Sequence, residues 1–141
     1  MIRILLVEDN LGDIRLTQEA FKELKTPIDL HYVTDGEEAI KFLLREAPYE
    51  NAPVPQLILL DINLPKKDGR QVLKFIKNEP ILKRIPVIIL STSNSDADIL
   101  QIYDLNANCY LTKPIDYECF LEMAYSIELF WIQKAKLPNV L

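Results

Sequence analysis

Short apolar runs alternate along the chain with longer segments in which apolar residues recur every three or four positions. The short runs are rich in Ile, Leu and Val and predict β-strands, whereas the longer spacing is typical of amphipathic helices. The predicted strands span 2–7, 29–34, 57–60, 86–91 and 108–112, and the predicted helices span 13–25, 36–47, 68–78, 95–105 and 116–134. Each strand is followed by one helix, so the pattern predicts five βα units.

The third and fourth predicted strands contain unbroken apolar runs, LILL (57–60) and VIIL (87–90). Such runs lack the alternation of a strand with one face in water, and they are typical of parallel strands covered by helices on both faces. We therefore expect an α/β fold with an open, doubly wound parallel sheet. The proline-containing segment 47–56 is predicted to be an extended loop.

Polar residues follow the apolar runs where the strands are expected to end. In open α/β sheets, functional residues gather beyond the carboxyl ends of the strands. The residues at these points are Glu8, Asp9, Asp61, Asn63, Ser91, Thr92, Thr112 and Lys113. If the first, third, fourth and fifth strands are neighbours, three carboxylates, hydroxyl groups and one ammonium share one edge of the sheet.

Each of these residues also has an ordinary structural interpretation. Asp9 could cap the first helix, Ser91 could bond to the backbone, and Lys113 could be solvated. Asp61 is harder to explain in this way, because a carboxylate that closes a buried strand needs a partner or a metal. Clustered acids repel one another unless a cation neutralises them, and oxygen ligands without His or Cys favour Mg²⁺ over zinc.

A carboxylate beside Mg²⁺ and a lysine is typical of an aspartyl-phosphate site. Asp61 would be the nucleophile toward a phosphoryl group, and the metal and Lys113 would offset the charge on the phosphoryl oxygens. The glycines Gly12, Gly36 and Gly69 match neither a Walker A loop nor a dinucleotide fingerprint. The phosphoryl donor is therefore not expected to be a nucleotide bound to this chain.

Composition limits the remaining possibilities. The chain has 141 residues, of which 49% are hydrophobic and 26% charged, which favours one globular domain. No apolar run approaches the roughly 18 residues of a membrane helix, and the N-terminal run is too short for a signal peptide, so we expect a cytoplasmic protein. The net charge of −5 argues against a dedicated nucleic-acid surface.

The chain resembles the receiver domains of two-component response regulators from about Ile2 to the last helix. The motifs that carry the resemblance are Glu8-Asp9 after LLV, Asp61 in LLDINLP, Ser91 in IILSTS, and Lys113-Pro114 in YLTKP. The resemblance implies a flavodoxin-like (βα)5 fold with the strand order 2-1-3-4-5.

The resemblance also implies roles for single residues. Asp61 would be the phosphoacceptor, and Lys113 would contact the phosphoryl group. Asp9, Asp61 and the backbone carbonyl of Asn63 would bind Mg²⁺, with Glu8 acting through water. Ser91 would be the switch hydroxyl, Tyr110 the switch aromatic, and the Lys113–Pro114 peptide bond would be cis.

Within this family, four segments are similar to the regulators paired with cyanobacterial and bacterial phytochrome kinases. They are DINLPKKDGRQVL, IPVIILSTSNSDADI, YDLNANCYLTKP and FWIQKAKLP. The resemblance implies a histidine-kinase partner of the phytochrome type. Thr92 departs from the small residue that is frequent at its position in receivers, so the lifetime of the phosphorylated form is left open.

We expect residues 1–134 to form the receiver domain and 135–141 a short tail, without an output domain. Signalling would then proceed by protein contact or phosphoryl relay, through the surface of the fourth helix, fifth strand and fifth helix.

The last predicted helix has two apolar stripes, although a receiver helix usually needs one. The stripe expected to face the sheet consists of Phe120, Met123, Ala124, Ile127, Phe130 and Trp131. The second stripe consists of Leu121, Tyr125, Leu129 and Ile132. We expect the second stripe to form a symmetric homodimer interface; the alternative is that the tail LPNVL folds back over it.

Two other functions fit parts of the pattern. A phosphatase with an aspartyl nucleophile commonly has a second acid two residues later, where this chain has Asn63. A degenerate receiver would act only by binding partners, but all the chemical residues are present here. Both alternatives are less consistent with the sequence than a phosphoacceptor.

Overall fold

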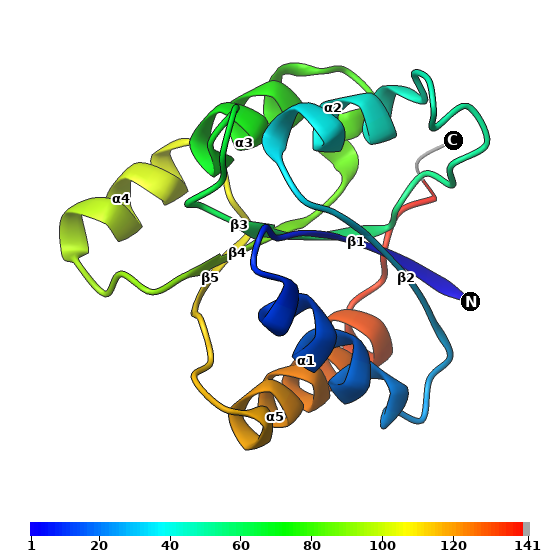
Figure 1. Ribbon diagram of the computed structural model, residues 1–141, viewed down its shortest axis with the longest axis vertical. Helices are drawn as coiled ribbons and strands as arrows, with labels where there is room; N and C mark the ends of the chain where they lie inside the picture. The colour runs from blue at the N-terminus through cyan, green and yellow to red at the C-terminus, as the bar shows by residue number, and fades with distance from the viewer. Residues whose placement is uncertain (140–141) are drawn as a thin grey trace.

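Five parallel strands form one sheet at the centre of the molecule (Figure 1). The computed structural model describes residues 1–139. The strands are β1 (Ile2–Val7), β2 (Ile28–Val33), β3 (Leu57–Asp61), β4 (Val87–Ser91) and β5 (Cys109–Thr112). They lie in the order β2-β1-β3-β4-β5 with parallel pairing throughout, which confirms the predicted fold and strand order.

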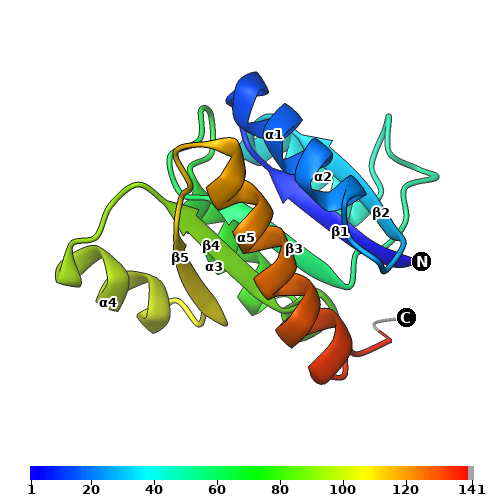
Figure 2. The ribbon, with the colours of Figure 1, turned by 90° about the horizontal axis from the view of Figure 1, so that it is seen from below.

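Helices cover both faces of the sheet. Helices α1 (Leu11–Lys22) and α5 (Tyr117–Ile127) lie on one face, and α2 (Gly36–Leu44), α3 (Gly69–Asn78) and α4 (Asp96–Asp104) lie on the other (Figure 1). Viewed from below, α5 runs diagonally across the strands, and α4 projects beyond the β5 edge (Figure 2). Within residues 1–139, none of these helices is long and apolar enough to span a membrane.

The core has two layers, one on each side of the sheet. Ile58 and Leu60 of β3 point into the layer under α2 and α3, whereas Leu57 and Leu59 point into the layer under α1 and α5. All four side chains are fully buried. This arrangement explains why the sequence of β3 shows no polar alternation, because both faces of the strand need apolar residues.

A polar side chain immediately before each α-helix fixes where that helix begins. The capping side chains are Asn10, Asp35, Asp68, Ser95 and Asp116, and each accepts a hydrogen bond from a backbone N–H in the first turn. Asn10, not Asp9, therefore caps α1, which leaves the Asp9 carboxylate available for the edge of the sheet.

The end of the last helix differs from the sequence prediction. The α-helical geometry stops at Ile127 and continues as a π-helical segment, Glu128–Lys134. A short 3₁₀ helix, Leu82–Arg84, was also not predicted. The buried Glu128 carboxylate accepts a hydrogen bond from the backbone N–H of Thr26 at 2.8 Å and so ties this segment to the α1–β2 loop.

Candidate functional site

Three carboxylates meet at the carboxyl end of the sheet. Oxygen atoms of Glu8, Asp9 and Asp61 all lie within 4.8 Å of one another. The sheet produces this meeting, because β1 pairs with β3 in a register that places Val7 opposite Leu60. The residues that follow these two positions are Glu8 and Asp61, so their side chains emerge side by side.

Lys113 brings a positive charge to the same place from the end of β5. Its backbone N–H donates to the carbonyl oxygen of Ser91 at 2.8 Å, which holds the start of the loop against β4. Its Nζ lies 2.9 Å from Glu8, 2.9 Å from Asp13 and 3.0 Å from Asp61. The side chain is 12% exposed, so these contacts are largely shielded from water.

Burial shifts the pKa values of Glu8 and Lys113 in opposite directions. Burial raises the pKa of the Glu8 carboxyl to about 7, with a further rise from the charge of Asp61 and an opposing effect of the hydrogen bond from Lys113. Burial lowers the pKa of the Lys113 ammonium, but its hydrogen bonds to Glu8, Asp13 and Asp61 outweigh burial and raise that pKa overall. Lys113 is therefore a permanent cation at this site.

The charge balance of the site fits a divalent cation. Four acidic side chains gather here with one ammonium: Glu8, Asp13 and Asp61 contact Lys113, and Asp9 lies beside Glu8 and Asp61. The excess of negative oxygen ligands, without His or Cys, suits a hard cation such as Mg²⁺ or Mn²⁺. Within residues 1–139, no other group of acidic, His or Cys side chains has this ligand spacing.

Asn63 and Gly69 shape the loop that follows Asp61. The Asn63 backbone N–H donates to Asp61 Oδ1 at 3.0 Å and fixes the orientation of that carboxylate. A Cβ atom at Gly69 would overlap the carbonyl oxygen of Asp61, so only glycine allows the chain to return this close to β3. The metal role of the Asn63 backbone carbonyl stays a prediction.

Ser91 and Tyr110 are linked through Ser93. Ser91 is buried at the end of β4, and its Oγ accepts a hydrogen bond from the backbone N–H of Ser93 at 3.1 Å. The Tyr110 hydroxyl donates to the carbonyl oxygen of Ser93 at 2.8 Å. The two predicted switch residues therefore hold the same short loop from its two sides.

The Lys113–Pro114 bond is not cis, and that expectation was wrong. The cis peptide bond among residues 1–139 is Ala47–Pro48. An X–Pro bond favours the trans form by about 0.5–1 kcal/mol in the absence of other constraints. Lys113 reaches its three carboxylates with a trans bond, so the contacts of this side chain do not require the other isomer.

The structure buries most of the first predicted stripe on the last helix and leaves much of the second stripe exposed. Phe120, Met123, Ala124 and Ile127 are buried as expected, but Phe130 is 57% exposed because it lies in the π-helical segment, where the angular step per residue is smaller. In the second stripe, Tyr125 and Leu129 are 46% and 55% exposed, whereas Leu121 and Ile132 are half-buried against the core. The end of the LPNVL tail, residues 140–141, lies outside the described residues.

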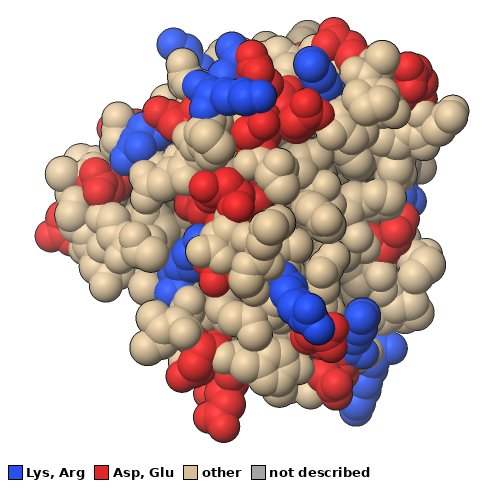
Figure 3. Space-filling model, viewed as in Figure 1, with Lys and Arg blue, Asp and Glu red and all other residues tan. Residues whose placement is uncertain are grey.

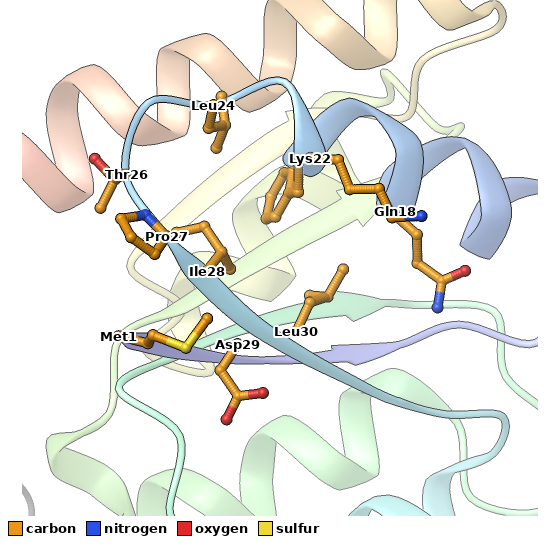
Figure 4. A pocket seen from close by; sticks show the side chains of 10 residues that line it. Met1, Gln18, Lys22, Leu24, Thr26, Pro27, Ile28, Asp29 and Leu30 are labelled. Carbon is orange, nitrogen blue, oxygen red and sulfur yellow. The ribbon is translucent and has the colours of Figure 1, made fainter.

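The acidic site and a surface cavity lie in different parts of the molecule. Figure 3 shows acidic side chains near the middle of the face seen in Figure 1, with mixed charges around them. A cavity of about 480 Å³ lies at the opposite end of the sheet, between α1 and β2, with Gln18, Leu24, Ile28 and Leu30 in its lining (Figure 4). None of the predicted site residues lines this cavity.

Sequence reasoning missed two residues of the site, Asp13 and Ser93. Asp13 carried no usable signal, because Asp9 lies before the Asn10 cap and outside α1, so the spacing of helical neighbours does not relate the two residues. Ser93 had no distinguishing signal in a loop that also contains Ser91, Thr92 and Ser95.

Comparisons with known proteins agree on one family. A family model described as the response regulator receiver domain matches residues 4–125. Response regulator Rcp1 of Synechocystis sp. is 49% identical over 135 residues, which are 96% of this chain and 92% of that protein.

Solved structures give the same result. The Mn²⁺-bound form of response regulator Rcp1 superposes with a TM-score of 0.91 at 47% identity, and the match covers 99% of this chain and 100% of that one. The phosphorylated cyanobacterial phytochrome response regulator RcpA superposes with a TM-score of 0.92 at 51% identity, covering 98% of this chain and 99% of that one.

Proposed function

The chain belongs to the response regulator receiver family, and from this premise we propose that it accepts a phosphoryl group on Asp61 from a sensor histidine kinase. The observation that carries the proposal is the setting of Asp61. Its carboxylate is held by the Asn63 N–H and the Lys113 ammonium, each at 3.0 Å, beside Glu8 and Asp9. These are the parts that phosphoryl transfer to a carboxylate requires.

The kinase partner that fits best is of the phytochrome type. Rcp1 and RcpA are about half identical to this chain over nearly its whole length, and RcpA is a cyanobacterial phytochrome response regulator in a phosphorylated form. The similarity supports a partner of the same class.

In the proposed transfer, one oxygen of Asp61 bonds to phosphorus as the bond from phosphorus to the kinase histidine nitrogen breaks. The departing imidazole keeps the electron pair of that bond. Lys113 donates to a phosphoryl oxygen and so holds the group in position. When bound, Mg²⁺ would offset charge on the phosphoryl oxygens, with Asp9, Asp61 and the Asn63 carbonyl as ligands and Glu8 beside them.

The loop after β4 would transmit the change. A phosphoryl oxygen near Ser91 would accept a hydrogen bond from the Ser91 hydroxyl, and a movement of Oγ toward it would draw along the Ser93 N–H that donates to Oγ. A shift of Ser93 would in turn carry the Tyr110 hydroxyl, which donates to the Ser93 carbonyl oxygen. The surface made by α4, β5 and α5 would then favour one of two pre-existing arrangements.

We further propose a homodimer through α5 and the segment that follows it. Tyr125, Leu129 and Phe130 are each about half exposed. Phe130 and Trp131 also border a surface cavity of about 300 Å³ between β5 and α5. A symmetric pair would remove this apolar surface from water.

The phosphoacceptor proposal is tested by intact-protein mass spectrometry after incubation with acetyl phosphate and Mg²⁺. Wild type should gain one phosphoryl group, and Asp61→Asn should gain none. Asp68→Asn, which removes a partly buried carboxylate from the loop after Asp61 and keeps a side chain able to cap α3, should behave as wild type. An equal gain in wild type and Asp61→Asn would exclude Asp61 as the acceptor.

A turnover enzyme is the second candidate, and the same protein can be tested for it. Asn63 offers no acid for proton transfer at the position where phosphatases of this type need one. A screen of phosphomonoesters should therefore show no sustained hydrolysis. Multiple turnovers that disappear in Asp61→Asn would favour the phosphatase instead.

A further inference from the structure

Asp13 contributes a carboxylate that the phosphoacceptor chemistry described above does not use. It comes from the first turn of α1, and its Oδ2 lies 2.9 Å from Lys113 Nζ. It is not one of the three acids that share ligand spacing for a metal among residues 1–139. Its contact in the site is therefore with the lysine.

The Lys113 ammonium has three N–H donors and three carboxylate partners. Those partners are Glu8 at 2.9 Å, Asp13 at 2.9 Å and Asp61 at 3.0 Å. After phosphorylation, the contact with Asp61 must pass to an oxygen of the phosphoryl group. Glu8 and Asp13 then remain as the two anchors that fix the direction of the third N–H.

We propose that Asp13 is a positioning residue, which together with Glu8 holds the Lys113 ammonium so that one N–H stays directed at the phosphoryl group on residue 61. This inference rests on the proposed function of Asp61. With Glu8 alone, the flexible lysine stem could swing about one anchor. Positioning supplies most of the catalysis in phosphoryl transfer, so a swinging ammonium should slow the reaction.

The backbone of α1 holds Asp13 itself in place. Its N–H donates to Asn10 Oδ1 at 3.0 Å, and its carbonyl oxygen accepts from the hydroxyl of the buried Thr17 at 2.7 Å. The cap of α1 is Asn10, so the Asp13 carboxylate is not needed for that task. A carboxylate at residue 13 attracts the ammonium by charge as well as by hydrogen bonding, whereas an amide or a methyl group at this position would lose the attraction between opposite charges.

The test compares Asp13→Asn and Asp13→Ala with Asp13→Glu, which keeps a carboxylate on a longer stem. Glu118→Gln is the matched control, since it removes an exposed first-turn carboxylate from α5. The maximal rate of phosphorylation by acetyl phosphate with Mg²⁺ should fall about tenfold in the two neutral variants, as expected for a loss of one strong hydrogen bond in the transition state. Asp13→Glu should recover most of the rate.

A second measurement needs no phosphorylation. In NMR spectra of unphosphorylated protein, the Lys113 ammonium should exchange its protons with water several-fold faster in Asp13→Asn than in wild type or Glu118→Gln, because one of its three acceptors is weakened. If Asp13 only stabilised α1, neither the phosphorylation rate nor the exchange rate of the ammonium protons would depend on a carboxylate at residue 13.

The outcomes separate this inference from the proposed function. Neutral variants that match Glu118→Gln in both rate and ammonium exchange, while wild type is phosphorylated, would overturn the positioning role alone. An Asp13→Glu variant as slow as Asp13→Asn would also overturn it. A wild-type protein that takes up no phosphoryl group would instead overturn the function of Asp61.

Discussion

Asp9 is the exposed member of the acidic cluster, whereas Glu8 and Asp61 are buried. It has no hydrogen-bond or ion-pair partner among residues 1–139, although its carboxylate lies near two others. At about 4 Å, two like charges in water repel by about 1 kcal/mol. Asp9 therefore stabilises the fold little by itself, and its placement is best explained by a cation.

We expect Asp9→Asn to change how the stability of the protein responds to metal. Mg²⁺ at ten times its dissociation constant should raise the free energy of unfolding of wild type by about 1.4 kcal/mol. In Asp9→Asn, the stability without metal should equal or exceed that of wild type, because repulsion is relieved, and the response to Mg²⁺ should largely disappear. Urea unfolding with MgCl₂, and with NaCl at matched ionic strength, measures both effects.

Equal Mg²⁺ stabilisation of wild type and Asp9→Asn would argue against a metal site at Asp9. Stabilisation by NaCl as large as that by MgCl₂ would indicate general screening of charge instead of a bound ion.

At the residue scale, the sequence predicted those site residues that follow apolar strands. Glu8, Asp61 and Lys113 could be found because each comes directly after or one residue after a strand run. Asp13 and Ser93 could not, because their contacts depend on how α1 packs beside Lys113 and on how the loop after β4 folds. Such contacts join elements far apart in sequence and leave no local pattern.

At the element scale, α4 is held mainly by polar contacts. Its one buried residue is Ile102, while Leu100 and Tyr103 are 63% and 46% exposed. Arg70 at the start of α3 donates to Gln101 at 2.8 Å and lies 3.7 Å from Asp98, and Ser93 donates to Asp98 at 2.7 Å. A helix fastened in this way can shift without opening the core.

Arg70→Ala should therefore loosen α4 without destabilising α3. Partly exposed polar contacts contribute about 0.2–1 kcal/mol, so amide hydrogen exchange in 96–104 should rise about two- to fivefold. Lys74→Ala, which removes an exposed cation from the same helix, is the control and should leave α4 unchanged. Mass-spectrometric hydrogen exchange resolves the two helices, and unchanged exchange in α4 of Arg70→Ala would show that Arg70 does not hold it.

Element boundaries show where local sequence rules stop. Caps such as Asp35 and Ser95 are local signals, and the helices they begin start within a residue of the prediction. The π-helical segment has no local signal of this kind. It brings Glu128 to the backbone N–H of Thr26, which lies 102 residues away in the chain.

At the scale of the whole molecule, chemistry and apolar surface occupy different regions. The acidic site lies at the carboxyl end of the sheet, whereas the exposed apolar residues Tyr125, Leu129 and Phe130 lie late in α5 and in the π-helical segment that follows it. The α5 helix runs away from the carboxyl end of the sheet (Figure 2). The separation allows a partner to contact α5 while a kinase approaches Asp61. The fifth strand and the loop that contains Lys113 connect the two regions.

The proposed homodimer can be separated from general stickiness by a variant pair. Leu129→Gln with Phe130→Gln removes two side chains that are 55% and 57% exposed, so the fold should not depend on them. Leu44→Gln removes a comparably exposed leucine from α2, on the opposite face of the sheet. Sedimentation velocity should show dimers for wild type and Leu44→Gln and monomers for the double variant, because only α5 would supply the shared interface. A monomeric wild type, or a double variant that still dimerises, would mean that the apolar surface of α5 serves another partner or none.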